Sequence, residues 1–262
     1  MSDASIPEVI EANGAEFLME IGRAAGGEVR DDGRVRWAIG NSPIDFFNCV
    51  AFADLDAEEA DREITASIER MRTQEVPGSW HVGPLMRPRD LGARLLAHGF
   101  EYGGDDVGMA VDLQELPKVM AVPSDFAVER IRDEAGLGEW AATFGLGFGI
   151  GPAEAGWMEG LFRKLGFEGS WRHYLGRLGG EPVATSALFF AAGVAGVYCV
   201  TTVDHARRRG IGAAVTLAAL RGARELGYGL AVLTSSEMGY SVYRKLGFVE
   251  YCRIGLYEWH PR

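Results

Sequence analysis

The sequence predicts an α/β protein in which helices flank a mixed central sheet, and three consecutive segments carry this prediction. The first is GVYCVTTV, residues 196–203, whose β-branched and aromatic side chains are typical of a strand. The second is AAVTLAALRGAREL, residues 213–226, which has strong helix formers and no proline. The third is the strand-like LAVLT, residues 230–234. Strand, helix and strand in this order predict an α/β fold.

The run RRRGIG, residues 207–212, lies between the first strand and the helix and is a candidate anion cradle. Gly210 and Gly212 let the backbone approach a ligand, while the first free amides and the dipole of the next helix favour an anion. Two familiar phosphate loops fit worse, because no lysine followed by Ser or Thr closes the loop and Val215 replaces a dinucleotide-binding glycine. The run therefore indicates a pyrophosphate carried by another kind of ligand.

A second signal follows the strand at 230–234, where EMGYSVYRKLGF predicts a helix over residues 237–246. Gly247 is suited to end that helix after two basic residues, and Phe248 is expected to pack back as the chain enters a last strand, YCRIGLYEW. Tyr243 then lies in the last turns of the helix.

These two signals together resemble the GNAT superfamily of acyl-CoA-dependent N-acyltransferases, whose signature is R/QxxGxG/A after a splayed strand, followed by strand, helix, Tyr and GF. The resemblance covers about residues 126–259 and implies the GNAT fold there. It implies that loop amides bind the pyrophosphate of coenzyme A, that the strand before the loop pairs with the pantetheine arm, and that a tyrosine protonates the departing thiolate. The positions that correspond are the loop Arg207, Arg208, Arg209, Gly210, Ile211, Gly212 and Ala213, the strand Thr201, Thr202 and Val203, and the acid Tyr243. Ser236 stands where many members have an asparagine near the acyl group.

The reaction that the resemblance implies is direct transfer of an acetyl group from acetyl-CoA to a primary amine of a small molecule or protein. Backbone amides near residues 200–202 would stabilise the oxyanion and Tyr243 would act as general acid. The general base is open, because no Asp, Glu or His lies between Glu181 and Asp204. Three carboxylates remain as candidates for the base, namely Glu154, Glu159 and Glu237. Each of them can also be explained as an exposed residue on the surface of a helix. An amine that is already partly neutral needs no base.

The chain is expected to form two domains, residues 1–118 and 125–262, because 262 residues exceed a usual single domain and two prolines lie near residues 115–124. The segment ARLLAHGFEY, residues 93–102, is a faint copy of SVYRKLGFVEY, but Leu95 takes the position of Tyr243 and no RxxGxG precedes residue 120. The first domain is thus expected to be a catalytically silent GNAT-like domain. An unrelated α/β domain stays open, because LFRKLGFEG at 161–169 shows that such helix ends recur for structural reasons.

Charge is distributed unevenly: residues 1–124 carry 11 basic and 23 acidic side chains, and residues 125–262 carry 15 and 14, for a net charge of −11. The acidic half could steer a cationic amine or merely keep the protein soluble. It argues against nucleic acid as a partner, and so against the related tandem-GNAT aminoacyl transferases that use charged transfer RNA. A non-catalytic acyl-CoA sensor remains the alternative function.

The remaining features of the sequence indicate a soluble cytoplasmic protein without a metal site. The three cysteines show no CxxC spacing and are expected to be free thiols rather than acyl carriers. No signal peptide or membrane span is visible, and a homodimer is left open. The family resemblance implies an acceptor wall at the glycine- and aromatic-rich residues 143–157, which would form a mobile lid; an ordinary packing element explains the same residues about as well.

Overall fold

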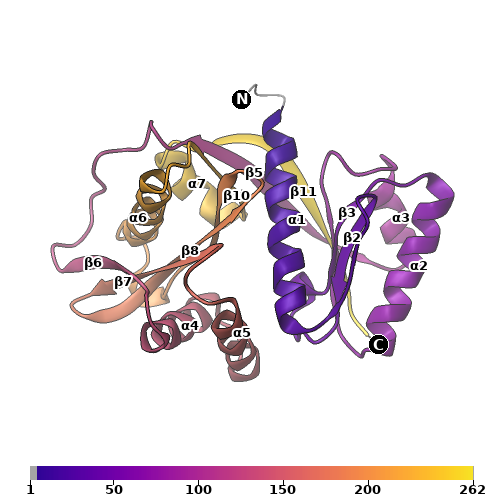
Figure 1. Ribbon diagram of the computed structural model, residues 1–262, viewed down its shortest axis with the longest axis horizontal. Helices are drawn as coiled ribbons and strands as arrows, with labels where there is room; N and C mark the ends of the chain where they lie inside the picture. Colours follow the sequence, from indigo (N-terminus) through magenta and orange to yellow (C-terminus); the bar gives the residue numbers. More distant parts are fainter. Residues whose placement is uncertain (1–4, 262) are drawn as a thin grey trace. The chain divides into compact units, whose positions relative to one another are not determined.

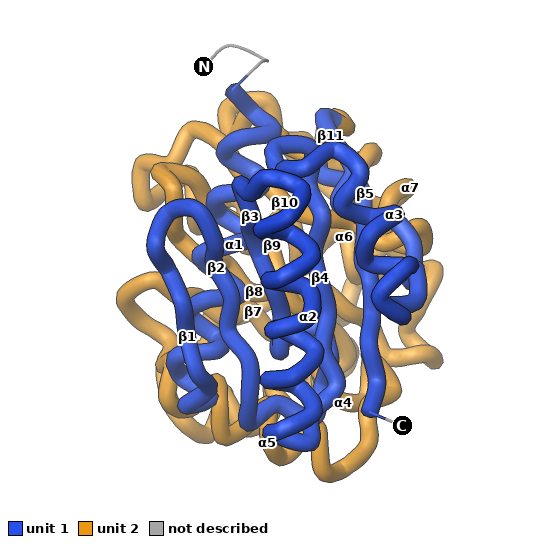
Figure 2. Tube along the Cα trace, turned by 90° about the vertical axis from the view of Figure 1, so that its right-hand side faces the viewer, with its two compact units in different colours: residues 1–108, 251–262 blue, residues 109–250 orange. Residues whose placement is uncertain are grey.

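The computed structural model describes residues 5–261, and the chain divides into two compact units, which Figure 2 colours separately. Unit 1 is formed by Met1–Gly108 together with Tyr251–Arg262, and unit 2 by Met109–Glu250. These limits differ from the expected domains 1–118 and 125–262, because the C-terminal residues group with the first unit.

Unit 1 combines an N-terminal helix, a mixed set of strands and two further helices (Figure 1). Its elements are α1 (Ile6–Ala25), β1 (Glu28–Asp31), β2 (Val35–Ile39), the 3-10 helix η2 (Asp45–Phe47), β3 (Cys49–Ala53), α2 (Ala57–Thr73), β4 (Gly78–Val82), α3 (Leu91–Ala97), β5 (Glu101–Asp112) and β11 (Val249–Trp259). Strands β1, β2 and β3 are antiparallel neighbours, β4 is parallel to β3, and β11 is antiparallel to β4. The last residues of β5 and the first of β11 belong to unit 2.

The strands of unit 1 are covered on both faces, with α1 on one and α2 and α3 on the other (Figure 1). Helix α1 approaches β2 so closely that a side chain on Gly22 would overlap that of Ala38. Between β3, β4, α2 and α3 lies an apolar core that includes the fully buried Trp80. The indole N–H of Trp80 donates to the Ser67 hydroxyl at 3.1 Å, so the polar end of this ring is satisfied inside the core.

Unit 2 contains the strand, helix, strand and helix that the sequence predicts between residues 196 and 246 (Figure 1). Its elements are β6 (Phe126–Arg130), α4 (Glu134–Phe148), α5 (Pro152–Leu165), β7 (Trp171–Leu178), β8 (Glu181–Ala191), β9 (Val194–Thr202), the 3-10 helix η3 (Asp204–Ala206), α6 (Ile211–Glu225), β10 (Leu230–Ser235) and α7 (Glu237–Lys245). The turn that joins β7 to β8 contains Gly179 and Gly180, whose φ angles are 57° and 89°.

The sheet of unit 2 is mixed, as predicted. Strands β6 to β9 are antiparallel neighbours, and β10 runs parallel to β9. Helix α6 packs on β6 to β9, and α4 packs on β7 to β9 from the opposite face (Figure 1). Under α4 and α5 lies a set of buried rings, in which Trp140 meets Phe162 edge-on at 4.8 Å and Trp171 stacks on His173 at 5.9 Å.

The C-terminal strand explains why the unit limits differ from the expected domains. Residues 255–259 of β11 pair with residues 78–82 of β4, from Gly255 opposite Val82 to Trp259 opposite Gly78. The partner of a strand is set by where its neighbours lie in space, which an alternating sequence such as YCRIGLYEW does not encode. The prediction of a strand here is confirmed.

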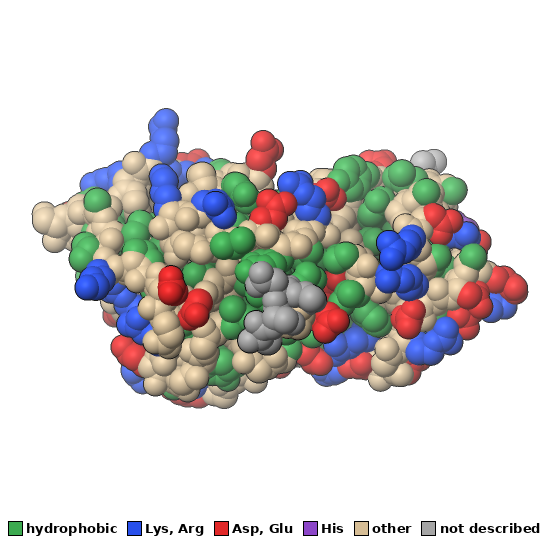
Figure 3. Space-filling view, turned by 90° about the horizontal axis from the view of Figure 1, so that it is seen from above, with side chains coloured by type: hydrophobic (Ala, Val, Ile, Leu, Met, Phe, Trp, Pro, Cys, Tyr) green, Lys and Arg blue, Asp and Glu red, His purple; other side chains and the backbone are tan. Residues whose placement is uncertain are grey.

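Charged side chains of unit 1 form ion pairs, which leave the net negative charge of the first half unchanged. In unit 1, Arg30 binds Glu63 at 2.8 Å and Arg34 binds Glu59 at 2.7 Å. Lys, Arg, Asp and Glu side chains are interspersed on the face drawn in Figure 3. Such surface pairs contribute little stability individually. Within residues 5–261, no helix has the length and apolar character needed to span a membrane.

Candidate active site

The predicted cradle forms the start of α6, directly after β9 and η3. Arg208 and Gly210 have positive φ angles of 61° and 79°, and Gly210 is the N-cap of α6 without any side-chain cap. The first helical hydrogen bond is made by the amide of Ala214 to the Gly210 carbonyl at 3.0 Å. The amides of residues 211–213 therefore precede that bond and are available to an anion at the positive end of the helix dipole.

The two glycines of the loop serve different purposes. At Gly210 a side chain would overlap the carbonyl oxygen of Ala121, so this glycine is required by the chain itself as well as by its positive φ. At Gly212 a Cβ atom would lie 3.3 Å from Thr202 Oγ1, which is a tight contact that a small shift relieves. A variant of Gly212 is accordingly the cleaner probe of ligand binding.

The three arginines of the loop are not equivalent. Arg207 donates from Nε to the Thr202 carbonyl at 2.9 Å and from Nη2 to the Gly147 carbonyl at 2.9 Å, and it pairs with Asp204 at 2.7 Å. Its guanidinium thus binds protein groups, although Arg207 is exposed, as Arg208 and Arg209 are. Local sequence patterns do not indicate this role, because the contact with Gly147 spans 60 positions.

Strand β9 bends and leaves its parallel neighbour before it reaches the loop. The register of β8 and β9 shifts between Thr185 and Ala187, and Cys199 on the bulged strand has a φ of 54°. The Thr185 hydroxyl donates to the Cys199 carbonyl at 2.7 Å and holds the bulge. The pairs between β9 and β10 are Ala195 with Ala231 and Gly196 with Val232, so the two strands pair only at the start of β9. The splayed strand of the family signature is present.

The predicted pantetheine strand divides into two parts. Thr201 and Thr202 are the last residues of β9 and are half-buried. Val203 lies beyond the strand, and its amide donates to the Val183 carbonyl at 2.9 Å. The Val203 amide is therefore used by the neighbouring strand, which leaves Thr201 and Thr202 as the better placed pair for a ligand.

Helix α7 brings Tyr243 back toward the end of β10. A Cβ atom on Gly239 would lie 2.8 Å from Tyr243 Cε2 and 3.1 Å from Ser235 Oγ, so both groups pack against the bare backbone of this glycine. Side chains on a helix point toward its N-terminus, which here follows the carboxyl end of β10. Tyr243 is 9% exposed and meets Phe248 edge-on at 5.8 Å. Sequence reasoning missed Gly239, although its spacing of four from Tyr243 is a usable signal.

Ser236 is the N-cap of α7. Its hydroxyl accepts from the Gly239 amide at 3.4 Å, and its side chain is exposed. This capping role accounts for a serine at the position, and an additional contact with an acyl group stays a prediction.

The candidate bases lie on helices. Glu159 pairs with Arg163 one turn later in α5 at 2.8 Å, and Glu237 is exposed in the first turn of α7. Glu154 lies in the first turn of α5 and its carboxylate approaches Gly151. All three thus have structural explanations: Glu154 and Glu237 lie in the first turn of a helix, and Glu159 is held in an ion pair.

The expected lid is helical in the structure. Residues 143–148 complete α4, Gly149 ends that helix with a φ of 67°, and α5 begins at Pro152. The packing alternative therefore accounts for most of this segment, and only residues 149–151 connect the two helices. Thr143 is buried, while Leu146 and Phe148 are 73% and 53% exposed.

The cysteines carry no disulfide among the described residues. Burial raises the pKa of the Cys49 and Cys199 thiols, so both are protonated at neutral pH. A protonated thiol is a poor nucleophile, which argues against a covalent acyl intermediate on Cys199 at the bulge.

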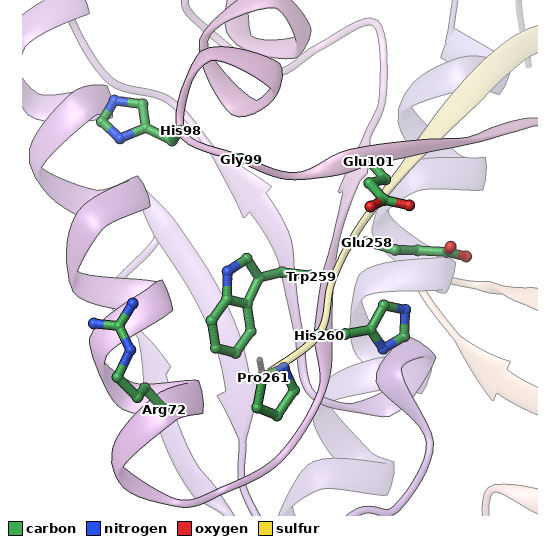
Figure 4. Close-up of a pocket in the computed structure, with 8 residues that line it drawn as sticks. All are labelled: Arg72, His98, Gly99, Glu101, Glu258, Trp259, His260 and Pro261. Carbon is green, nitrogen blue, oxygen red and sulfur yellow. The ribbon is translucent and has the colours of Figure 1, made fainter.

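The cavity drawn in Figure 4 belongs to unit 1 and contains none of the predicted site residues. It has a volume of about 510 Å³, and its lining includes Arg72, Glu101, Glu258, Trp259 and His260. Burial raises the pKa of the Glu258 carboxyl, and the nearby Asp45 carboxylate adds to this shift.

A group of possible metal ligands lies beside this cavity. Donor atoms of Asp45, Glu258 and His260 lie within 4.8 Å of one another, and His260 is exposed. We assign no ion to this group, because exposed acidic side chains beside a histidine are common on protein surfaces.

Comparison with known proteins agrees with this geometry. The family model of the acetyltransferase (GNAT) domain matches residues 89–240, which is more than half of the chain. A search of curated proteins by sequence found no match. Among solved structures, a GCN5-related N-acetyltransferase from Kribbella flavida superposes with a TM-score of 0.71 at 20% identity, covering 94% of this chain and 95% of its own.

Two further solved structures share the fold. A GCN5-related N-acetyltransferase from Sphaerobacter thermophilus has a TM-score of 0.60 at 18% identity, with coverage of 76% and 67%. A tandem GNAT protein from the clavulanic acid biosynthesis pathway has a TM-score of 0.57 at 15% identity, with coverage of 89% and 82%. With a glycine loop at an uncapped helix start, a bulged and splayed strand and a matching family description, the chain belongs to the GNAT family and is an acyltransferase.

Proposed function

We propose that unit 2 transfers an acetyl group from acetyl-CoA to a primary amine of a small molecule or peptide without a covalent enzyme intermediate. The observation that carries this proposal is the start of α6, where positive φ angles at Arg208 and Gly210 and the absence of a side-chain cap leave amides for a pyrophosphate. The GNAT family generally uses acetyl-CoA, and this loop fits its pyrophosphate.

The residues that would hold the coenzyme are the loop amides from Arg208 to Ala213 and the end of β9 at Thr201 and Thr202. Bound there, acetyl-CoA supplies an activated thioester. The half-buried position of both threonines would limit access of water, and the exposed Arg208 and Arg209 add positive charge near a polyanionic ligand. Ile211 is buried, so its side chain anchors the loop while its amide is the first of the helix.

The groups that could donate or accept a proton in the site are consistent with direct transfer. Tyr243 Oη would donate a proton to the departing sulfur, and amides at the β9 bulge, residues 200–202, would donate to the oxyanion. The protonated Cys199 thiol is unsuited to accept the acyl group. Since strands β8 and β9 carry no Asp, Glu or His between Glu181 and Asp204, the acceptor would arrive as the neutral amine or lose its proton to water.

We further propose that unit 1 is a catalytically silent GNAT-like domain. Its order β3, α2, β4, α3, β5 repeats the order β9, α6, β10, α7, β11, and in both cases the two strands that flank the first helix are parallel. The Phe100 amide bonds to the Leu95 carbonyl and the Phe248 amide to the Tyr243 carbonyl, both at 3.1 Å. An apolar side chain thus occupies the position of the proposed acid, and the two helix ends match.

Calorimetry with acetyl-CoA followed by thiol release across a panel of amines tests the proposed function. We expect binding at one site and turnover with at least one primary amine. Binding without turnover on any amine would favour an acyl-CoA sensor, and the absence of binding would reject both.

A further inference from the structure

One side chain joins three parts of unit 2: the proposed coenzyme loop, the end of β9 and the end of α4. Arg207 begins the coenzyme loop, donates to the carbonyl of Thr202 at the end of β9, and donates to the carbonyl of Gly147 at the end of α4, each at 2.9 Å. Helix α4 leads into the connection, residues 149–151, that the family resemblance places on the acceptor side.

The contact at α4 is suited to a guanidinium. Gly147 is the penultimate residue of α4, so its carbonyl is among the last four, which have no partner within the helix. A cation there is favoured by the negative end of the helix dipole, and the planar fork of arginine donates to two carbonyls at once. Lysine cannot reproduce this geometry, because its charge sits on a single nitrogen.

The same two elements also pack directly on each other. A side chain on Gly147 would overlap that of Thr201, so bare backbone of α4 lies against the residue next to Thr202. A displacement of the end of α4 is therefore transmitted to the end of β9 through packing and through the guanidinium together.

We propose that Arg207 is a positioning residue that couples the end of α4 to occupancy of the coenzyme cradle. Coenzyme that orders the loop and the end of β9 then also orders residues 145–151, so the acceptor side of the site is completed only when coenzyme is bound. This inference rests on the proposed coenzyme site and concerns its regulation.

Hydrogen exchange of wild-type protein with and without free coenzyme A tests the coupling. We expect coenzyme to slow amide exchange in residues 145–151 by about fivefold or more, because typical coupling free energies between two sites correspond to factors of this size or larger. In Arg207→Lys we expect this coenzyme-dependent slowing to be lost, with exchange of the free protein changed much less.

A matched control is Arg163→Lys, because Arg163 holds the opposite end of α4 through Glu134 at 3.2 Å and has no bond to β9. We expect coenzyme-dependent slowing at residues 145–151 to persist in this variant. Gly147→Ala provides a second route, since it forces Thr201 away while retaining Arg207.

The outcomes separate the two proposals. If wild-type protein does not bind coenzyme A in calorimetry, the proposed function fails and the coupling fails with it. If coenzyme binds but exchange at residues 145–151 does not change, or if Arg207→Lys speeds exchange equally with and without coenzyme, Arg207 is only structural and the coupling alone is rejected.

Discussion

Helices α6 and α2 occupy equivalent places in the two units, yet their first turns are opposite in character. Helix α6 begins at Gly210 with no side-chain cap, whereas α2 begins at Asp56 with a capping box. The Asp56 carboxylate accepts from the Glu59 amide at 2.8 Å, and the Glu59 carboxylate accepts from the Asp56 amide at 3.0 Å. The amide that is third in the helix is thus used internally in α2, while the corresponding amide of Ala213 is available in α6.

The difference shows that, in one topology, the N-cap and the first three residues of a helix decide whether its first turn can bind an anion. The first turn of α2 also contains Glu58 and Glu59, whose negative charges stabilise the helix and repel a phosphate. The pKa of Glu59 is lowered to about 2, mainly by its hydrogen bond from Arg34, so this carboxylate is ionised at neutral pH. The proposed silence of unit 1 has this physical basis.

The largest expected effect concerns Tyr243, the proposed acid, whose position in unit 1 is taken by Leu95. Tyr243→Phe removes the proposed acid and is expected to lower kcat by about 100-fold, the lower end of general acid–base contributions. The KM for acetyl-CoA should change little, because packing against Phe248 is retained. Steady-state kinetics of both substrates measures this split.

Tyr240→Phe is the matched control, since Tyr240 lies one turn earlier and its hydroxyl donates to Glu250 at 3.2 Å. We expect nearly unchanged kcat there. An unchanged kcat in Tyr243→Phe would contradict the proposed role of Tyr243 as general acid.

Acidification is expected to separate the stabilities of the two units. In unit 2, burial lowers the pKa of His173 to about 4, below the value of about 6.5 in the unfolded chain. As the pH falls, this histidine is therefore protonated in the unfolded chain before it is protonated in the folded protein. The free energy of unfolding of unit 2 thus falls as the pH drops from 6.5 toward 4. Between pH 7 and pH 5 the loss is about 2 kcal/mol. In unit 1, His81 behaves likewise, but burial raises the pKa of Glu11 to about 7, which stabilises the folded state as pH falls from 7 to 4.5.

The two shifts in unit 1 oppose each other, so its stability should change little over this range. Native-state hydrogen exchange at pH 7 and pH 5 can compare amides of β7 with amides of β4. An equal loss in both strands would contradict this contrast.

The coenzyme cradle itself is tested by Gly212→Val. A branched side chain at the second position of α6 crowds Thr202 Oγ1 and the approach of a phosphate, and we expect coenzyme A to bind about tenfold more weakly, or about 1.4 kcal/mol. Arg209→Ala should weaken binding less, because the proposed contact is made by backbone amides rather than by this exposed side chain. Calorimetry ranks the two, and the reverse order would contradict the role of the amides.

The matched control lies in α2, where Glu58 holds the equivalent second position. Glu58→Val is expected to leave coenzyme affinity unchanged.

The smallest effect is expected at the N-cap of α2. Asp56→Ala removes the capping box and should lower the free energy of unfolding by about 1 kcal/mol. Denaturant unfolding measures this loss, with Glu58→Gln as a control on the same exposed turn. Coenzyme binding by Asp56→Ala at α2 would show that the cap alone silences unit 1.

Much of the fold of unit 2 could be predicted because its signals are local. The strand, glycine loop and helix at 196–226 and the helix that ends before Gly247 are encoded by neighbouring residues, and the structure confirms them. The start of α7 at Glu237 is likewise confirmed.

The rest depends on contacts between distant residues. The bulge at Cys199 contains neither glycine nor proline. Gly210 packs against the backbone of the distant Ala121, and the bond from Arg207 to Gly147 joins two elements. The family resemblance identified the loop residues, but only the geometry shows that the first arginine binds protein carbonyls. The pairing of β11 with β4 likewise depends on distant residues.

An amide NMR titration with free coenzyme A tests the contrast between α6 and α2 most directly. We predict saturable shifts of the amides from Arg208 to Ala213, with no change in the first turn of α2, residues 57–60. Shifts confined to α2, or no saturable shift in the loop before α6, would contradict the assignment of the coenzyme site.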